Sequence, residues 1–269
     1  MKIAVIGHIE WCRFVKVDHL PAPGEIIRSV ESWEEAAGGG SVAAVQLAKL
    51  AGSCLFFTAV GNDQNGKDAI KQLTELGVEV HASVINDVPT KEAFVHIDKN
   101  KERAITVIGN LAPSGNDKSL PWEKLAEMDA VYFVSGDKAA LTAARRAKQL
   151  IATARVLPVL KEGSIKLDAL VMSQKDNNER YDSDDLSLEP SLVVMTDGTE
   201  GGSTLNGETY KAESINGEDF RDTYGCGDSF AAGLTFALAQ GLSVTETLKL
   251  AAHVGAQAAQ RYGAHGVTV

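Results

Sequence analysis

Cysteine is scarce in this chain of 269 residues, which has three in all: Cys12, Cys54 and Cys226. Three scattered cysteines make neither a disulfide framework nor a cysteine-rich metal cluster, so both classes of protein are excluded. Long apolar runs are also missing, since no window approaches the ~20 residues that a membrane-spanning helix needs. The apolar run at residues 1–7 is too short for a signal peptide. We therefore expect a cytoplasmic protein without a membrane partner.

Basic residues are outnumbered in the sequence. Lys and Arg total 26 against 36 Asp and Glu, which gives a formal net charge of −10. Binding to a phosphate backbone needs a basic surface, so we expect no nucleic-acid partner.

What the chain does have is an apolar content of 44%, enough for a buried core. Its length suits one α/β domain over residues 1–269. Short β-branched runs alternate with helical patterns, which predicts a mostly parallel, doubly wound sheet with helices on both faces. The predicted strands are Lys2–Ile6, Cys54–Ala59, Ala130–Val134, Val156–Leu160, Ala169–Met172 and Leu192–Thr196. The predicted helices are Val42–Leu50, Lys67–Leu76, Ala139–Thr153, Ser229–Gln240 and Val244–Tyr262.

Two segments, Arg13–Val30 and Glu92–Ile108, break this alternation with extended patterns that lack a helical period. The second segment has the pattern of a β-hairpin that turns at Asp98–Lys101. On composition alone it would be an edge hairpin of the main sheet.

The segment Asp222–Asp228, with the sequence DTYGCGD, is the most informative part of the chain. Gly225 and Gly227 allow a tight turn and remove Cβ atoms that would keep an anion from the backbone N–H groups. The helix Ser229–Gln240 follows at once, so its unpaired N–H groups and its dipole favour a bound anion. Asp228 lies at the mouth of this cradle, where it could accept a hydroxyl proton. The alternative is an ordinary glycine turn in which the two aspartates cap the helix.

The complete Asp-Thr-x-Gly-x-Gly-Asp pattern resembles the C-terminal motif of the ribokinase-like (PfkB) carbohydrate kinases. The resemblance implies that Asp228 is the catalytic base and that Gly225, Cys226 and Gly227 form the anion hole. It also implies a ribokinase-like α/β fold with a small β lid, from segments near residues 10–31 and 90–110. In this family the lid often supplies a dimer contact, so a homodimer is possible.

Further segments extend the resemblance over nearly the whole chain. The segment Thr196–Gly202 matches one that lies against the nucleotide phosphates in the family, which implies nucleotide contacts from Thr196, Gly198 and Gly201. ATP and Mg²⁺ are the implied cofactors. The family motif Asn-x-x-Glu, which organises the hydration shell of Mg²⁺, is altered to Ser-x-x-Asp, so Asp176 becomes the candidate that binds the metal through water. The alternative is a solvated Asp176 beside a helix cap.

The departures from the family cluster on the sugar side. Cys12 stands where an Asp usually binds substrate hydroxyls, and Glu10 stands at a position that is often Asn. The glycine motif at 38–41 opens a helix that lacks the usual Asn. The candidate substrate-binding residues are therefore Glu10, Gly38, Gly39, Gly40, Ser41 and the lid cation Arg103. For Glu10 the equal alternative is a solvent-facing charge, and Arg103 is equally an exposed strand charge.

A thiol among helix N-terminal amides, as at Cys226, is expected to have a lowered pKa. A small residue that is tolerated because only its N–H matters is the favoured interpretation of Cys226.

The favoured function is an ATP-dependent kinase that phosphorylates a hydroxyl of a sugar or sugar-like small molecule. A ligand-binding module with weak or no turnover is the second hypothesis, supported by the altered sugar side. A dinucleotide-dependent oxidoreductase ranks last, because no G-x-G-x-x-G turn follows the first strand.

Overall fold

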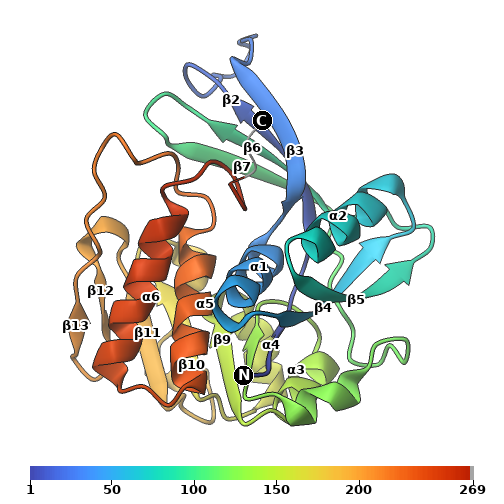
Figure 1. The fold of residues 1–269 in the computed structure, drawn as a ribbon, viewed down its shortest axis with the longest axis vertical. Helices are drawn as coiled ribbons and strands as arrows, with labels where there is room; N and C mark the ends of the chain where they lie inside the picture. Colours follow the sequence, from blue (N-terminus) through green and yellow to red (C-terminus); the bar gives the residue numbers. More distant parts are fainter. Residues whose placement is uncertain (267–269) are drawn as a thin grey trace.

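A nine-stranded sheet forms the centre of the computed structural model, which describes residues 1–266 (Figure 1). Its strands are β1 (Ile3–Ile6), β4 (Cys54–Gly61), β5 (Val78–Ile85), β8 (Ala130–Phe133), β9 (Gln149–Thr153), β10 (Ala169–Ser173), β11 (Leu192–Thr196), β12 (Gly202–Thr204) and β13 (Thr209–Tyr210). They lie in the order β13-β12-β11-β10-β9-β8-β1-β4-β5. The pairs that β12 makes with β11 and β13 are antiparallel, and the others are parallel.

Helices cover both faces of this sheet, because successive side chains of a strand point to opposite sides. In β1, Ile3 and Val5 join one apolar core, and Ala4 and Ile6 join the other. The first core is covered by α1 (Gly39–Ala51), α2 (Gln64–Glu75), α5 (Cys226–Ala239) and α6 (Val244–Ala258). The second is covered by η1 (Trp122–Glu127), α3 (Lys138–Ala144) and α4 (Leu157–Gly163). The predicted doubly wound α/β class is confirmed.

A second sheet of four strands rises from one end of the first, at the top of Figure 1. It consists of β2 (Glu10–Lys16), β3 (Glu31–Ala37), β6 (Glu92–Ile97) and β7 (Arg103–Ile108), in the order β3-β2-β6-β7. The predicted hairpin is confirmed as β6 and β7, with Ile97 opposite Arg103. Its assignment to the edge of the main sheet was wrong, because β6 pairs with β2. We call this smaller sheet the lid.

Two predicted elements of the main domain were wrong. The expected helix Ala139–Thr153 is a short helix, α3, followed by the buried central strand β9. The expected strand Val156–Leu160 is instead the end of the turn η2 (Ala154–Val156) and the start of α4. Pro158 lies in the first turn of α4, where its missing N–H costs nothing.

The lid is tied to a distant loop by a carboxylate. Glu35 of β3 is fully buried and accepts hydrogen bonds from Trp33 Nε1 (3.0 Å) and the amide of Ala264 (2.9 Å). Burial raises the pKa of Glu35. Gly263, with φ +66°, lies against the same carboxylate, and a Cβ there would come 2.0 Å from Glu35 Oε1. The amide of Gly263 donates to Asp222 Oδ2 at 2.8 Å, so one loop holds two buried carboxylates.

Strand β1 has a parallel neighbour on each side, β4 on one and β8 on the other. The chain first adds β4 and β5 on one side of β1 and then β8 to β11 on the other, so the strand order reverses at β1. Ligands of open α/β sheets bind at such a switch point, beyond the carboxyl ends of the strands. Gly7 follows β1 at this edge, and a Cβ there would come 3.0 Å from Val134 Cβ, just after β8. Within residues 1–266, no helix is long and apolar enough to span a membrane.

Candidate active site

A glycine turn ahead of α5 is held in place by the carboxylate of Asp222. This side chain is buried, and its Oδ1 accepts the amide of Tyr224 at 2.6 Å while its Oδ2 accepts that of Gly263. Gly225 has φ +71°, and a Cβ at this position would come 2.9 Å from Val42 Cγ1. The helix α5 has Gly225 as its N-cap, with no side chain capping it. The alternative of aspartates as helix caps was therefore wrong.

The amide of Cys226, the first of α5, donates to the carbonyl of Thr223, whereas within residues 1–266 the next two amides of the helix are unpaired. A Cβ added at Gly227 would meet no atom within 4 Å. Among the described residues, the amides of Gly227 and Asp228 have no hydrogen-bond acceptor, as expected at a helix N-terminus. This geometry suits an anion, which these unpaired donors and the helix dipole would stabilise.

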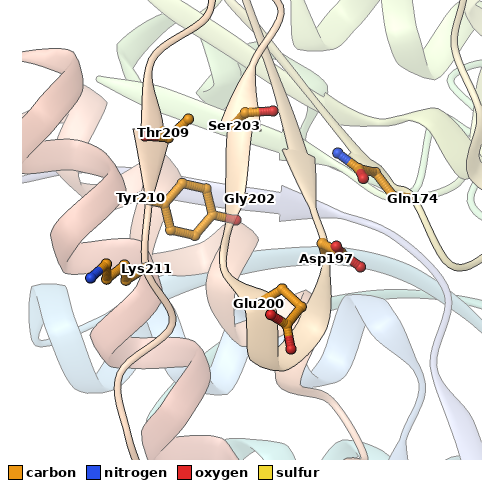
Figure 2. A pocket seen from close by; sticks show the side chains of 8 residues that line it. All are labelled: Gln174, Asp197, Glu200, Gly202, Ser203, Thr209, Tyr210 and Lys211. Carbon is orange, nitrogen blue, oxygen red and sulfur yellow. The ribbon is translucent and has the colours of Figure 1, made fainter.

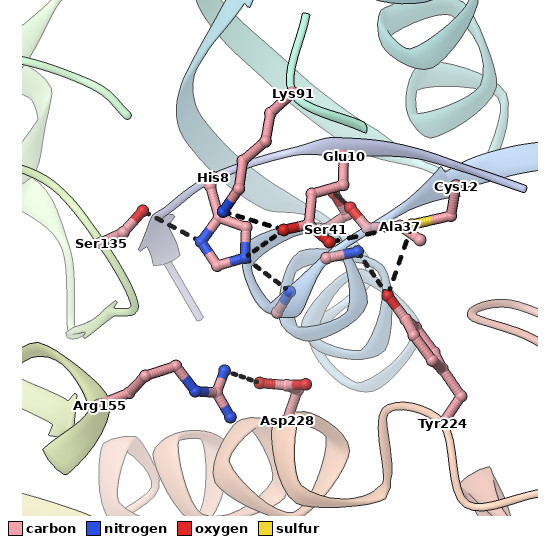
Figure 3. Close-up of polar contacts among 12 residues, drawn as sticks. His8, Glu10, Cys12, Ala37, Ser41, Lys91, Ser135, Arg155, Tyr224 and Asp228 are labelled. Atoms are coloured by element: carbon pink, nitrogen blue, oxygen red, sulfur yellow. Dashed lines mark hydrogen bonds and ion pairs between the residues drawn. The ribbon is translucent and has the colours of Figure 1, made fainter. Parts of the chain in front are cut away.

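Asp228 lies beside these amides and faces a guanidinium that the sequence did not point to (Figure 3). Arg155 Nη1 lies 3.5 Å from Asp228 Oδ1, and Arg155 Nε donates to Glu179 Oε1 at 2.7 Å. Burial opposes the charge of Arg155, but the two carboxylates outweigh it and raise its pKa. Arg155 is therefore a permanent cation at the candidate catalytic base.

His8 organises the opposite side of the site. The amide of Gly39 donates to His8 Nε2 at 3.3 Å, so Nδ1 carries the proton and donates to Ser135 Oγ at 3.2 Å. Burial, with the nearby charges of Lys91 and Arg155, lowers the pKa of His8 well below its usual value. His8 is therefore a neutral, fixed link between the ends of β1 and β8.

Glu10 is a buried member of an ion pair. Its side chain is 7% exposed, and its Oε1 lies 2.9 Å from Lys91 Nζ and 3.6 Å from His8 Nε2. The alternative of a solvent-facing Glu10 was wrong. Cys12 Sγ lies 3.9 Å from Glu10 Oε2 and 3.7 Å from Tyr224 Oη, and burial raises the pKa of this thiol.

The glycine motif at residues 38–41, at the start of α1, is packed against the protein. Several of its hydrogen-bond donors already have acceptors within the protein. The amides of Gly38 and Gly39 donate to Tyr224 Oη and His8 Nε2. A Cβ at Gly40 would come 2.5 Å from the carbonyl oxygen of His8. Ser41 is fully buried, and its hydroxyl donates to the carbonyl of Ala37.

Arg103 reaches from the lid strand β7 to the glycine turn. Its Nη1 donates to Thr223 Oγ1 at 2.7 Å, and its guanidinium lies 6.0 Å from the ring of Tyr224. Arg103 is thus an exposed charge of β7, as the alternative had it, and it also lies beside the turn before α5.

A hollow of about 520 Å³ opens at the ends of β10 and β11, beside the hairpin of β12 and β13 (Figure 2). It is lined by Gln174, Asp197, Glu200, Gly202, Ser203, Thr209, Tyr210 and Lys211. The predicted nucleotide residues Thr196, Gly198 and Gly201 are not among the lining residues, but each is adjacent in sequence to one of them. Gly201 has φ +93°, and a Cβ there would come 2.1 Å from the carbonyl oxygen of Tyr210. Gly201 therefore allows the turn to pack closely against the backbone of Tyr210 at the edge of the hollow.

A family model described as "pfkB family carbohydrate kinase" matches residues 1–175 and 166–268. The chain belongs to the pfkB family of carbohydrate kinases. It is accordingly a phosphotransferase with an alcohol group as acceptor.

Similar proteins cover almost the whole of this pfkB kinase. A ribokinase of Lactococcus lactis is 24% identical over 287 residues, which span 98% of this chain and 93% of that protein. The crystal structure of ribokinase from Thermotoga maritima has a TM-score of 0.80 at 22% identity, covering 98% of this chain and 94% of the other. The structure of Arabidopsis thaliana ribokinase complexed with ribose and ATP has a TM-score of 0.72 at 21% identity, covering 97% and 93%. The structural matches show the ribokinase-like fold.

Asp176 of this kinase caps a turn. Its Oδ1 accepts the amide of Asn178 at 2.8 Å at the start of η3 (Asn177–Glu179), and the side chain is exposed. Three residues later, Glu179 is 12% exposed and reaches Arg155. The contact that links this segment to Asp228 is thus made by Glu179, which the sequence analysis missed.

Cys226 departs from its expected chemistry. Burial is the main cause that raises the pKa of its thiol, to about 11, so the expected lowering was wrong. The thiol is a poor nucleophile at neutral pH, because the thiolate is the reactive form. The amide of Cys226 donates to the carbonyl oxygen of Thr223 at 3.4 Å, so it is not a free donor of the predicted anion hole.

Proposed function

We propose that this pfkB kinase transfers the γ-phosphoryl group of ATP to a hydroxyl of a sugar or sugar-like small molecule. The observation that carries the proposal is the position of Asp228. Its carboxylate lies at the unpaired amides that begin α5, across from the cluster of His8, Glu10 and Lys91 (Figure 3). A base beside an anion cradle is the arrangement that phosphoryl transfer to an alcohol requires.

In this mechanism Asp228 accepts the proton of the acceptor hydroxyl as its oxygen attacks the γ-phosphorus. The bond from that phosphorus to the leaving ADP oxygen breaks, and the products are ADP and a phosphate ester. The amides of Gly227 and Asp228 stabilise the charge on the transferring group. Such catalysis depends on positioning and electrostatics.

The nucleotide is proposed to enter the hollow at β10 to β13, with Thr196, Gly198 and Gly201 shaping its floor. Tyr210 supports this role, because its ring stacks on Phe230 of α5 with centroids 5.4 Å apart. A residue that lines the hollow thus contacts the helix that carries Asp228.

Magnesium is the implied metal. Among residues 1–266, no group of three or more His, Cys, Asp or Glu side chains could hold an ion directly. Mg²⁺ keeps several waters and needs only one or two carboxylates beside nucleotide phosphates. Asp176 and Glu179 would hold its water shell, and the ion would neutralise phosphate charge.

The acceptor is proposed to lie between Asp228 and Glu10, with Gly38 to Ser41 and Arg103 at its border. Ribose is the first acceptor to test, because a similar kinase has been crystallised with it. The pair Glu10–Lys91 and the thiol of Cys12 give this pocket its own set of partners. An acceptor that differs from ribose in its hydroxyl pattern is therefore equally compatible with this pocket.

A second candidate is a catalytically weak or inactive ligand-binding module. The buried Ser41 favours it, because its hydroxyl already donates a hydrogen bond to the carbonyl oxygen of Ala37 and not to a substrate. The exposed face of β7 also allows a homodimer through the lid, since Ile105, Val107 and Ile108 are each more than 40% exposed.

The deciding experiment is a screen of ATP consumption with Mg²⁺ over sugars, nucleosides and polyols, run in parallel with Asp228→Asn. If the protein is a kinase, the wild type consumes ATP with at least one acceptor, whereas Asp228→Asn does not. Saturable binding of an acceptor without ATP consumption would support the binding module.

A further inference from the structure

Two arginines of this chain pair with carboxylates near the ends of neighbouring strands, and they do so in different ways. Arg145 donates to the carbonyl oxygens of Lys166, Ala147 and Lys148 as well as to Asp168. An arginine with three carbonyl acceptors fastens the backbone. This is a structural role.

Arg155 donates to no backbone carbonyl among the described residues. Its Nε and Nη2 both bind Glu179 Oε1, and its Nη1 lies at the long distance of 3.5 Å from Asp228 Oδ1. A guanidinium has five N–H donors in a rigid fork, so the edge that carries Nη1 keeps donors to spare. One edge is therefore anchored, and the other is presented to the catalytic base.

The presented edge points at the site of the reaction. Arg155 follows the carboxyl end of β9, and its side chain remains 42% exposed. Gly39 lies next to the pair, since a Cβ there would come 2.7 Å from Asp228 Oδ1 and 3.1 Å from Arg155 Nη1. The absence of that Cβ keeps the two side chains accessible from the start of α1.

We propose that Arg155 is a catalytic residue that binds the transferring phosphoryl group. Before nucleotide binds, Glu179 holds the guanidinium and Asp228 accepts its free edge. When the γ-phosphate arrives at the amides of α5, Nη1 exchanges Asp228 for phosphate oxygens, because guanidinium matches their geometry well. The same exchange frees Asp228 to accept the hydroxyl proton. The inference rests on the proposed kinase function.

The test compares binding of two nucleotides with Mg²⁺ by calorimetry: ADP and the non-hydrolysable β,γ-imido analogue of ATP. Arg155→Ala is expected to lower the affinity for the triphosphate analogue by about 10–100-fold, which corresponds to the loss of one charge-assisted hydrogen bond. The affinity of the variant for ADP should stay within about two-fold of the wild type, because ADP lacks the γ-phosphate. Arg155→Lys is expected to recover part of the loss, since it keeps the charge but not the fork. The control is Arg146→Ala, which removes an exposed arginine.

Equal weakening of both nucleotides, or of neither, would overturn the proposal and leave Arg155 as a spacer between two carboxylates. Should Arg155→Ala not fold, Arg155→Gln keeps the size and gives the same comparison. Once an acceptor is known, kcat of Arg155→Ala is expected to fall about 10²–10³-fold, as for loss of one oxyanion donor. If the wild type phosphorylates no acceptor, the proposed function fails, but the difference between the two nucleotides still tests Arg155.

Discussion

Lys91 Nζ lies 2.9 Å from Glu10 Oε1, and this ion pair joins the start of lid strand β6 to the start of β2. Both side chains are largely buried, at 15% and 7% exposure. The backbone follows the same path, since the amide of Trp11 donates to the carbonyl of Lys91 at 2.8 Å. A charged pair is thus placed at the acceptor side of the site.

Glu10→Gln is expected to raise the acceptor KM about 10-fold, because a charge-assisted hydrogen bond to the substrate is weakened. The affinity for ADP should not change, since the nucleotide hollow lies elsewhere. Steady-state kinetics measure the first quantity and calorimetry the second. The control is Glu34→Gln, which changes an exposed lid carboxylate paired with Arg13. An unchanged KM and kcat in Glu10→Gln would move substrate recognition away from this pair.

Asp228→Asn is expected to reduce kcat by about 10²–10⁴-fold, because the amide cannot accept the hydroxyl proton. The melting temperature and ADP affinity should stay close to those of the wild type. Coupled ATP-consumption assays with the acceptor from the screen give the rate. Activity within a few-fold of the wild type would remove Asp228 as the base.

Gly225 and Gly227 should respond differently to alanine. Gly225→Ala is expected to lower the melting temperature, because φ is +71° and the new Cβ would come 2.9 Å from Val42. Gly227→Ala should leave the melting temperature nearly unchanged, since its Cβ meets no atom within 4 Å. It should still reduce kcat, because the methyl group enters the space assigned to the phosphate.

Thermal melts and kinetics on both variants separate these effects. Full activity of Gly227→Ala would show that the phosphate does not lie against this amide.

Alkylation of Cys226 should be slow at neutral pH and accelerate as pH rises. A pKa raised to about 11 means that the reactive thiolate grows about tenfold per pH unit up to that value. Mass spectrometry of iodoacetamide labelling from pH 7 to 10 measures the slope, with Cys226→Ala as the control. That variant should keep its activity, because the position supplies a backbone and not a thiol. A plateau below pH 9 would contradict the raised pKa.

The exposed face of β7 leads to a prediction about assembly. Val107 is 49% exposed on this strand, and a charge there would interrupt an apolar contact between two lids. If the lid forms a dimer, Val107→Lys should shift the protein to the monomer in sedimentation velocity, whereas Val84→Lys on β5 should not. A wild type that is monomeric at all accessible concentrations would exclude this dimer.

The glycine turn before α5 could be predicted from sequence because its requirements are local. The left-handed φ at residue 225 requires glycine, and the helix that follows requires an apolar run. Both requirements are therefore visible in neighbouring residues of the sequence. The same holds for the strands that begin near Ile3 and Leu192, which are continuous apolar runs.

Arg155 could not be predicted because its neighbours were misassigned. The helical pattern of α3 runs through Arg145 into the strand residues Gln149–Thr153 without Gly or Pro between them. With β9 hidden inside a helix, Arg155 no longer followed the carboxyl end of a strand. Its partner Glu179 is 24 residues away in sequence, a contact that periodicity cannot show. A useful signal was Pro158, which indicates a helix start just after Arg155.

The carboxylate of Glu35 sets an order of events during folding. It accepts the amide of Ala264, which lies 229 positions later in sequence, and Gly263 packs against it where no other side chain fits. A ribosome that has made the lid strand β3 must still make everything up to and including α5 and α6 before Ala264, the partner of this carboxylate, is synthesised. Until then the carboxylate lacks the amide of Ala264 and has only Trp33 Nε1 as a donor within the lid, which disfavours its early burial. Synthesis from the N-terminus therefore allows the lid to be joined to the loop at residues 263–264 only after almost the whole chain has been made.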